Sequence, residues 1–443
     1  MSDFKSLHPI KLLSKYAMPN MVSAIFFSIY FIVDSIFVGF FLGKDALASM
    51  ALVMPFIIIS FGLSDMIAIG SSVQISMLLG KAKHLKANNI FSASICIIIV
   101  ISSIMAFIGY FLVPLALDIF NTNENIKSMS LEYLNIFCYF YPFVAIPFAI
   151  DSYLRICGKN IYSMANNIII SITNIVLDYL FIVELSLGLA GAALATCIGF
   201  TLGAIIGLYP FLTNKLTLKF TKFYISLASF QNIILNGSSE FLSNISSQAL
   251  AILVNYIILK ISTIEYVAIF SIISYIDTFI MSAIISIYDS MQPSFSYNYA
   301  TKNKARLKWI AKYTMILAFL VSLIAFIIVT IFGEEIFSVF IKKGEEFLIP
   351  LGVSALLIFS FNFLVAWFNL FIGSYLTACN EVKKSLAISL LNNLISPFIV
   401  LLILSQLLGI NGVLITSFVA EILVMLISIR ILKNSFKLSE QSH

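Results

Sequence analysis

The chain has 443 residues, of which 60% are hydrophobic and only 11% are charged, with a net charge of +5 and a mean hydropathy of +1.04. A soluble domain carries about a quarter charged residues, so this chain lacks the polar side chains to cover a water-facing surface. Apolar stretches of about 20 residues, the length that a helix needs to cross a bilayer, recur along the whole sequence. Because backbone groups in lipid must be satisfied within each segment, the sequence predicts an all-α polytopic membrane protein.

We predict about twelve transmembrane helices, joined by polar connections too short to form a soluble domain. In chain order the predicted spans cover residues 16–41, 50–79, 90–114, 129–154, 161–183, 189–212, 232–259, 266–296, 309–332, 348–378, 385–407 and 411–432. The five cysteines fall within or just inside these segments, which indicates packing residues rather than disulfides or a metal site.

The basic residues orient these spans. With the N-terminus in the cytoplasm, nearly all Lys and Arg residues fall on the inner side, as the positive-inside rule requires. The exceptions are Lys44, Lys127, Lys260, Lys342 and Lys343. Both termini are therefore expected in the cytoplasm. This distribution accounts for the positive charge, so we expect no nucleic-acid partner.

An internal repeat divides the chain. Three pairs of small residues recur at one constant offset: Gly188 and Gly409, Gly191 and Gly412, and Thr196 and Ser417. Six spans in each half keep both halves in the same orientation, which makes the repeat parallel. We therefore predict an N-terminal six-helix lobe over 1–213, a cytoplasmic linker over 214–230 and a C-terminal six-helix lobe over 231–443. Two such lobes are typical of transporters, since one lobe can rock against the other.

Three segments, in this order, resemble the multidrug and toxic compound extrusion (MATE) family, part of the multidrug, oligosaccharidyl-lipid and polysaccharide flippase group. They are Ile32–Gly39, then Asn174–Ile182 followed by Gly188–Ala193, and then Gln292–Ala300. The resemblance covers essentially the whole chain. It implies a V-shaped pair of six-helix bundles in the plasma (inner) membrane that exports organic cations in exchange for inward H⁺ or Na⁺.

Acidic residues within the spans are candidates for ion coupling, because ionisable groups in a bilayer are costly to bury. Asp34 in the first span, Asp178 in the fifth with Asn174 one turn before it, and Thr196 in the sixth lie at similar depth. Their oxygens can form a cage for Na⁺; alternatively, repulsion between the two carboxylates favours a bound proton. A structural hydrogen-bonded cluster is a further interpretation. The resemblance assigns the coupling role to the two acids.

The second half lacks this cage, because the repeat offset places Ile395 and Ile399 opposite Asn174 and Asp178. Glu240, near the inner part of the seventh span, is the candidate there for cation binding or coupling, against a helix-packing contact. The span interiors carry acids but, apart from Arg155 at an inner edge, no Lys or Arg. This sign of charge favours cationic, amphipathic substrates.

We therefore predict a secondary active multidrug efflux transporter that works by alternating access, as a monomer, without a cofactor or a metal other than the coupling ion. A flippase for a lipid-linked or other amphipathic substrate is the alternative, although an anionic headgroup needs basic residues in the cavity. A membrane-embedded enzyme is a remote alternative. His8, His84 and His443 lie at the termini or in a loop, and no phosphate-binding loop motif occurs.

Overall fold

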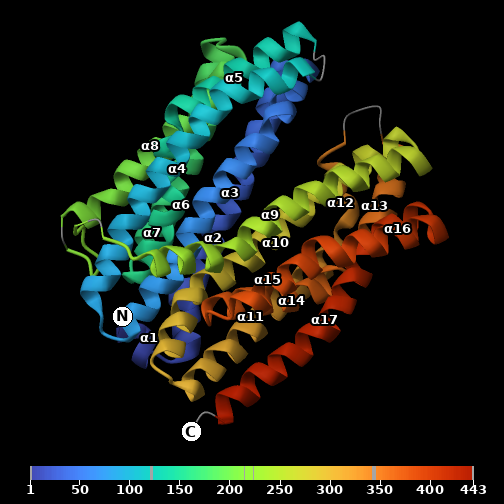
Figure 1. Cartoon of the computed structure of the whole chain (residues 1–443). Coiled ribbons are helices and arrows are strands. Elements are labelled where there is room, and N and C mark those ends of the chain that lie inside the picture. Colours follow the sequence, from blue (N-terminus) through green and yellow to red (C-terminus); the bar gives the residue numbers. More distant parts are fainter. Residues whose placement is uncertain (1, 120–122, 214, 223, 342–345, 442–443) are drawn as a thin grey trace. The chain divides into compact units, whose positions relative to one another are not determined.

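The computed structural model describes residues 2–119, 123–213, 215–222, 224–341 and 346–441, and within these ranges the chain is helical with no strand (Figure 1). Eleven of the described helices are long and apolar enough to cross a membrane, and a bent pair of shorter helices makes up to twelve spans. The prediction of a polytopic helical membrane protein with about twelve spans is confirmed. The side of the membrane that the termini face stays a prediction.

The helices follow one another with short connections. The first half contains α1 (Ser2–Ser6), α2 (Pro9–Phe37), η1 (Val38–Leu42), α3 (Lys44–Gly80), α4 (His84–Ile119), α5 (Glu124–Val144), α6 (Ile146–Ile156), α7 (Asn160–Asp178), η2 (Tyr179–Glu184) and α8 (Gly188–Leu212). The second half contains α9 (Leu227–Ile261), α10 (Ile264–Ala300), α11 (Lys304–Ile331), α12 (Gly333–Ser338), α13 (Leu348–Ser360), α14 (Phe363–Ala378), α15 (Val382–Leu390), η3 (Leu391–Ile395), α16 (Ser396–Leu408) and α17 (Ile410–Gln441). The segments labelled η are π-helical.

The fourth and tenth spans, which the sequence predicts as single helices, are both interrupted. The fourth span breaks into α5 and α6 at Ala145, between Pro142 and Pro147. Proline cannot donate a backbone hydrogen bond, which explains this break. The tenth span bends by 44° between α13 and α14, where the sequence has no proline.

The backbone carries the internal repeat that the sequence predicts. Positive φ angles, which L-residues rarely adopt, occur at matching connections of the two halves: Ala82 (55°) and Lys302 (56°), Gly158 (76°) and Asn380 (60°), and Gly188 (61°) and Gly409 (57°). Glycine adopts a positive φ angle without a steric penalty. Its presence at both Gly188 and Gly409 therefore reflects the same turn geometry at matching positions of the two halves. The repeat is therefore structural as well as sequential.

The chain forms two compact units, which we call the first unit (1–241 and 296–301) and the second unit (242–295 and 302–443). In the first unit the segment predicted as a linker is packed rather than loose. Leu216 and Leu218 are buried in its core, and the Thr221 backbone N–H donates to Ser92 Oγ on α4 at 2.8 Å. The predicted lobe boundary at 214–230 stays a prediction.

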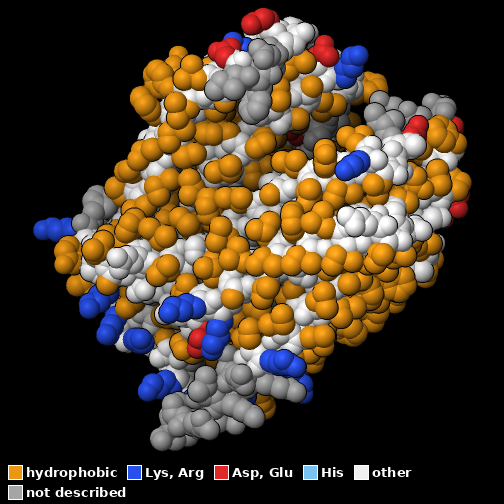
Figure 2. All heavy atoms as spheres, turned by 45° about the vertical axis from the view of Figure 1, so that its right-hand side comes forward, with side chains coloured by type: hydrophobic (Ala, Val, Ile, Leu, Met, Phe, Trp, Pro, Cys, Tyr) orange, Lys and Arg blue, Asp and Glu red, His pale blue; other side chains and the backbone are white. Residues whose placement is uncertain are grey.

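The surface suits a lipid environment. Hydrophobic side chains cover most of the face shown in Figure 2, and charged side chains on it are few. Long runs of exposed isoleucine, leucine and phenylalanine along α4, α11 and α16 contribute to this apolar surface. In water such a surface would drive aggregation, whereas acyl chains cover it without cost.

In the first unit, α3 and α9 come close enough for backbone contact at two glycines. A Cβ atom on Gly70 would lie 1.9 Å from the Ile233 carbonyl oxygen, and one on Gly237 would lie 1.9 Å from the Met66 carbonyl oxygen. Small residues that allow such close approach are a common means of packing membrane helices. At Gly70 and Gly237, therefore, no residue larger than glycine fits unless the two helices move apart.

We expect Gly70→Ala to lower the free energy of unfolding of the purified protein in detergent by about 1–3 kcal/mol, and with it the melting temperature. The added methyl group overlaps backbone of the facing helix that cannot move aside. Gly373→Ala is the matched control, since a Cβ there meets nothing within 4 Å. The control is expected to keep or raise the melting temperature, as alanine favours helix. Equal melting of the Gly70→Ala and wild-type proteins would contradict the close crossing.

Candidate functional site

Each of the two predicted coupling acids sits where a regular helix gives way to a π-helical segment. Asp34 lies in the last turn of α2, and its backbone oxygen accepts from the Val38 N–H at the start of η1. Asp178 is the last residue of α7, directly before η2. The two π-helical segments contact each other, and α2 packs along α7. Such π-helical insertions occur frequently at functional sites.

The carboxyl groups of Asp34 and Asp178 lie within hydrogen-bonding range of each other. Asp34 is 5% exposed and Asp178 is fully buried. Asp34 Oδ1 and both carboxyl oxygens of Asp178 accept no hydrogen bond from any described residue. Two ionised carboxylates in contact repel each other and have no hydrogen to donate, so the pair requires a positive charge between its members.

Asn174 and Thr196 form the second part of the predicted cage. Asn174 Nδ2 donates to Thr196 Oγ1 at 3.0 Å, joining α7 to α8. Asn174 Oδ1 is buried and accepts no hydrogen bond from a described residue. Because Asn174 lies one helical turn before Asp178, the structure places all four predicted side chains in one region of the first unit. Their role in coupling stays a prediction.

Two tyrosines accompany the acids. Tyr30 and Tyr133 are buried, and both lie within electrostatic reach of Asp34 and Asp178. They belong to an apolar cluster that also contains Phe200, whose ring meets that of Tyr30 edge-on. This cluster separates the carboxyl pair from solvent. Among 19 tyrosines, nothing in the sequence alone singles out Tyr133.

Glu240 lies on a different helix from this cluster. It is partly buried in the stretch of α9 that belongs to the first unit, although the sequence places it in the second lobe. It is one turn beyond Asn236 and three residues after Gly237, which contacts the backbone of α3. Its proposed role in cation binding stays a prediction.

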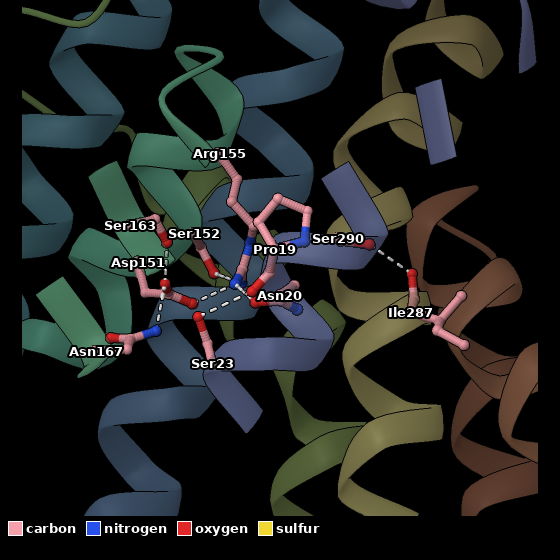
Figure 3. Close-up of polar contacts among 10 residues, drawn as sticks. All are labelled: Pro19, Asn20, Ser23, Asp151, Ser152, Arg155, Ser163, Asn167, Ile287 and Ser290. Carbon is pink, nitrogen blue, oxygen red and sulfur yellow. Dashed lines mark hydrogen bonds and ion pairs between the residues drawn. The ribbon is translucent and has the colours of Figure 1, made fainter. Parts of the chain in front are cut away.

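The first unit holds a second polar network, which Figure 3 shows around the Arg155 guanidinium. Arg155 pairs with Asp151 one turn before it on α6, and donates from Nη1 to Asn20 Oδ1 on α2 at 2.7 Å. Asp151 also accepts from Ser163 and Asn167 on α7. Arg155 is only 6% exposed, so its guanidinium is buried among these polar partners. The one basic residue inside the first unit's spans is thus neutralised by its own acid.

A comparison with family models decides the class of the protein. The model described as MatE matches residues 19–180 and 240–403, which is most of the chain and both halves of the repeat. The chain belongs to the MATE family of efflux transporters. Its members are transporters, so the protein is a multi-pass membrane transporter and not an enzyme.

Curated relatives within the family are multidrug exporters. The chain is 24% identical over 437 residues to the multidrug export protein MepA of Staphylococcus haemolyticus, and 22% identical over 429 residues to that of Staphylococcus saprophyticus. Each alignment covers 94% of this chain and 92% of the relative. The relatives therefore match nearly from end to end.

Solved structures of the MATE family share the fold. A MATE protein in complex with MaL6 superposes with a TM-score of 0.93 at 20% identity, covering 98% of both chains. An outward-facing multidrug resistance MATE transporter superposes with a TM-score of 0.91 at 19% identity, covering 98% of this chain and 97% of the other. At these identities the likeness establishes the fold of the MATE family and leaves the substrate open.

We expect Arg155→Met to lower the free energy of unfolding by about 3 kcal/mol, because it leaves the Asp151 charge without its cation. The double variant Asp151→Asn/Arg155→Met is expected to lose less, since no uncompensated charge remains. Thermal unfolding of the single and double variants in one detergent measures both. A double variant that loses the sum of the two single losses would contradict the pairing.

Proposed function

We propose that the protein exports cationic, amphipathic compounds across the plasma membrane by antiport with H⁺ or Na⁺, and that Asp34 and Asp178 bind the coupling ion. The proposal includes alternating access as the mechanism and the monomer as the working unit. The relatives named as multidrug export proteins support the substrate class.

The observation that carries the proposal is the contact between two carboxyl groups in an apolar cluster without a basic neighbour. The groups that act electrostatically on Asp34 and Asp178 are each other, and Arg155 is engaged by Asp151. A fixed structural pair would need a donor or a base, whereas Asp34 Oδ1 and both carboxyl oxygens of Asp178 accept no hydrogen bond from a described residue. A site that binds and releases a coupling ion must instead lack a permanent positive partner. The Asp34–Asp178 pair has this property.

The amide and hydroxyl beside the pair suit a metal ion, whereas the two acids alone suffice for a proton. Asn174 Oδ1 supplies a free oxygen and Thr196 Oγ1 a second one, as hard cations require. Either ion brings the same driving force per charge, about 2.3 kcal/mol for each 100 mV of membrane potential. Exchange of one monovalent cationic substrate for one such ion moves no net charge, so the concentration gradient of the coupling ion drives that exchange. The membrane potential contributes only when more positive charge enters than leaves.

Export is tested by loss of function at Asp178. Energised cells that express the wild-type protein are expected to lose ethidium faster than cells with an empty vector, and cells that express Asp178→Asn should match the vector. Asp118→Asn is the matched control, because Asp118 is an exposed acid paired only with Lys127 at the end of α4. Wild-type cells that behave like the vector despite membrane insertion would contradict polyspecific cation export.

Coupling is separated from substrate binding at Asp34. In proteoliposomes, Asp34→Asn is expected to abolish dye accumulation driven by a proton gradient or a sodium gradient, whichever drives the wild type. Its dissociation constant for the dye, from fluorescence anisotropy, should stay within about threefold of the wild-type value. Undiminished ion-driven accumulation by this variant would remove Asp34 from the coupling site.

A further inference from the structure

In the first unit, one face of α4 is covered by the segment that joins the two halves of the chain. The Lys219 backbone N–H donates to Asn88 Oδ1 at 3.2 Å. Thr221 donates from its backbone N–H to Ser92 Oγ at 2.8 Å and from Oγ1 to Asn89 Oδ1 at 2.8 Å. Three polar side chains near the start of α4 therefore hold this segment against the helix.

The counterpart of α4 in the second half is α11 (Figure 1). Each helix begins two residues after a residue with a positive φ angle, Ala82 before α4 and Lys302 before α11. Counted from these two residues, the three α4 side chains that hold the connecting segment correspond, in the same order, to Lys308, Trp309 and Lys312. The second half thus has two ammonium groups and an indole where the first half has two amides and a hydroxyl.

These residues lie on a face of α11 that points away from the core of the second unit. Lys304, Lys308 and Lys312 follow one another at intervals of about one helical turn, and Trp309 lies about one turn before Lys312. Trp309 is 59% exposed, and Lys312 is exposed as well. We call these four residues the basic face of α11. The helix contacts α13 and α14, and its buried residues at this end lie on its other side: Leu307, Ile310, Ala311 and Thr314.

The basic face has no acid on its own helix to balance its charge. No Asp or Glu occurs between residues 290 and 333, a stretch that contains all of α11. The chain after Leu432 carries two lysines and one acid, so it brings no net negative charge. Like charges one turn apart destabilise a helix, and an anion that lies along them removes this repulsion. The occupant that suits this face is therefore an anion.

The position of the basic face along α11 indicates which anion this is. From Thr314 to its end at Ile331 the helix carries no charged residue, so the basic face lies where hydrocarbon meets water. Tryptophan is enriched at this boundary, and lysine side chains extend from it toward the headgroups. Ammonium groups bind phosphate oxygens strongly. A zwitterionic headgroup carries its own ammonium group, which the lysines repel, so an anionic phospholipid fits better.

We propose that the basic face of α11 binds the headgroup of an anionic phospholipid, in the leaflet that the sequence predicts to be the cytoplasmic one. The lipid phosphate pairs with the lysine ammonium groups, and the Trp309 indole packs against the glycerol and the first methylene groups. On α11 the lipid takes the place that the connecting segment takes on α4. This surface does not depend on which compound or ion the protein transports.

The fluorescence of Trp309 tests the proposal, because the chain has only one other tryptophan. The variant Trp367→Phe leaves Trp309 as the sole tryptophan of the full-length protein in lipid vesicles. Phosphatidylglycerol brominated near the headgroup end of one acyl chain is expected to quench it more strongly than phosphatidylcholine with the same bromines. The ratio of the two binding constants should be at least about three, and Lys304→Gln/Lys308→Gln/Lys312→Gln should bring it to about one.

Two further variants separate this surface from general charge effects and from folding defects. Lys81→Gln/Lys83→Gln/Lys86→Gln removes three exposed lysines at the matching connection of the first half and should leave the ratio unchanged. Arginine in place of the three lysines of the basic face keeps the charge and should keep the ratio. Equal quenching by the two lipids in Trp367→Phe overturns the proposal, and so does a preference that survives glutamine at the basic face. Weak quenching by both lipids, as expected if another part of the chain covers Trp309, overturns it too.

Discussion

Two neighbouring carboxyl groups inside an apolar helix bundle cannot both stay ionised without a positive charge between them. Their surroundings must therefore admit a proton or a metal cation. Asp34 and Asp178 impose this condition on the first unit. The helices that carry them change to π-helical geometry beside them, and an apolar cluster with two tyrosines keeps water away. The sole buried arginine of this unit is held by Asp151, so it does not relieve the pair.

The two halves of the repeat share a backbone but differ in chemistry. Positive φ angles recur at matching turns, and the fifth and eleventh spans each contain a π-helical segment. In the eleventh span this segment presents Asn392 to Glu421, whereas in the fifth it follows Asp178. In the register of the repeat the two π-helical segments do not coincide, because Ile395, the last residue of η3, corresponds to Asn174, which precedes η2. The halves therefore share turns but place their helical irregularities differently.

Much of the fold could be predicted because a bilayer leaves few choices. Hydrophobic length gives the number of spans, and residue counts along each span give approximate depth, which brings Asp34 and Asp178 to the same level. Depth does not give rotation about a helix axis. The contacts of Glu421 with Asn369 and Asn392, and the proximity of Tyr133 to the acids, depend on which helix faces meet, so sequence spacing within single spans could not reveal them. The sequence has no proline at the bend in the tenth span, so the bend could not be predicted either.

The chain passes from one compact unit to the other three times, within α9, near the end of α10 and again directly after it. Two long helices therefore begin in one unit and end in the other. No single cut in the gene yields two halves that each contain a whole unit. A fragment that ends within 214–230 therefore lacks two pieces of the first unit, residues 231–241 of α9 and the last residues of α10.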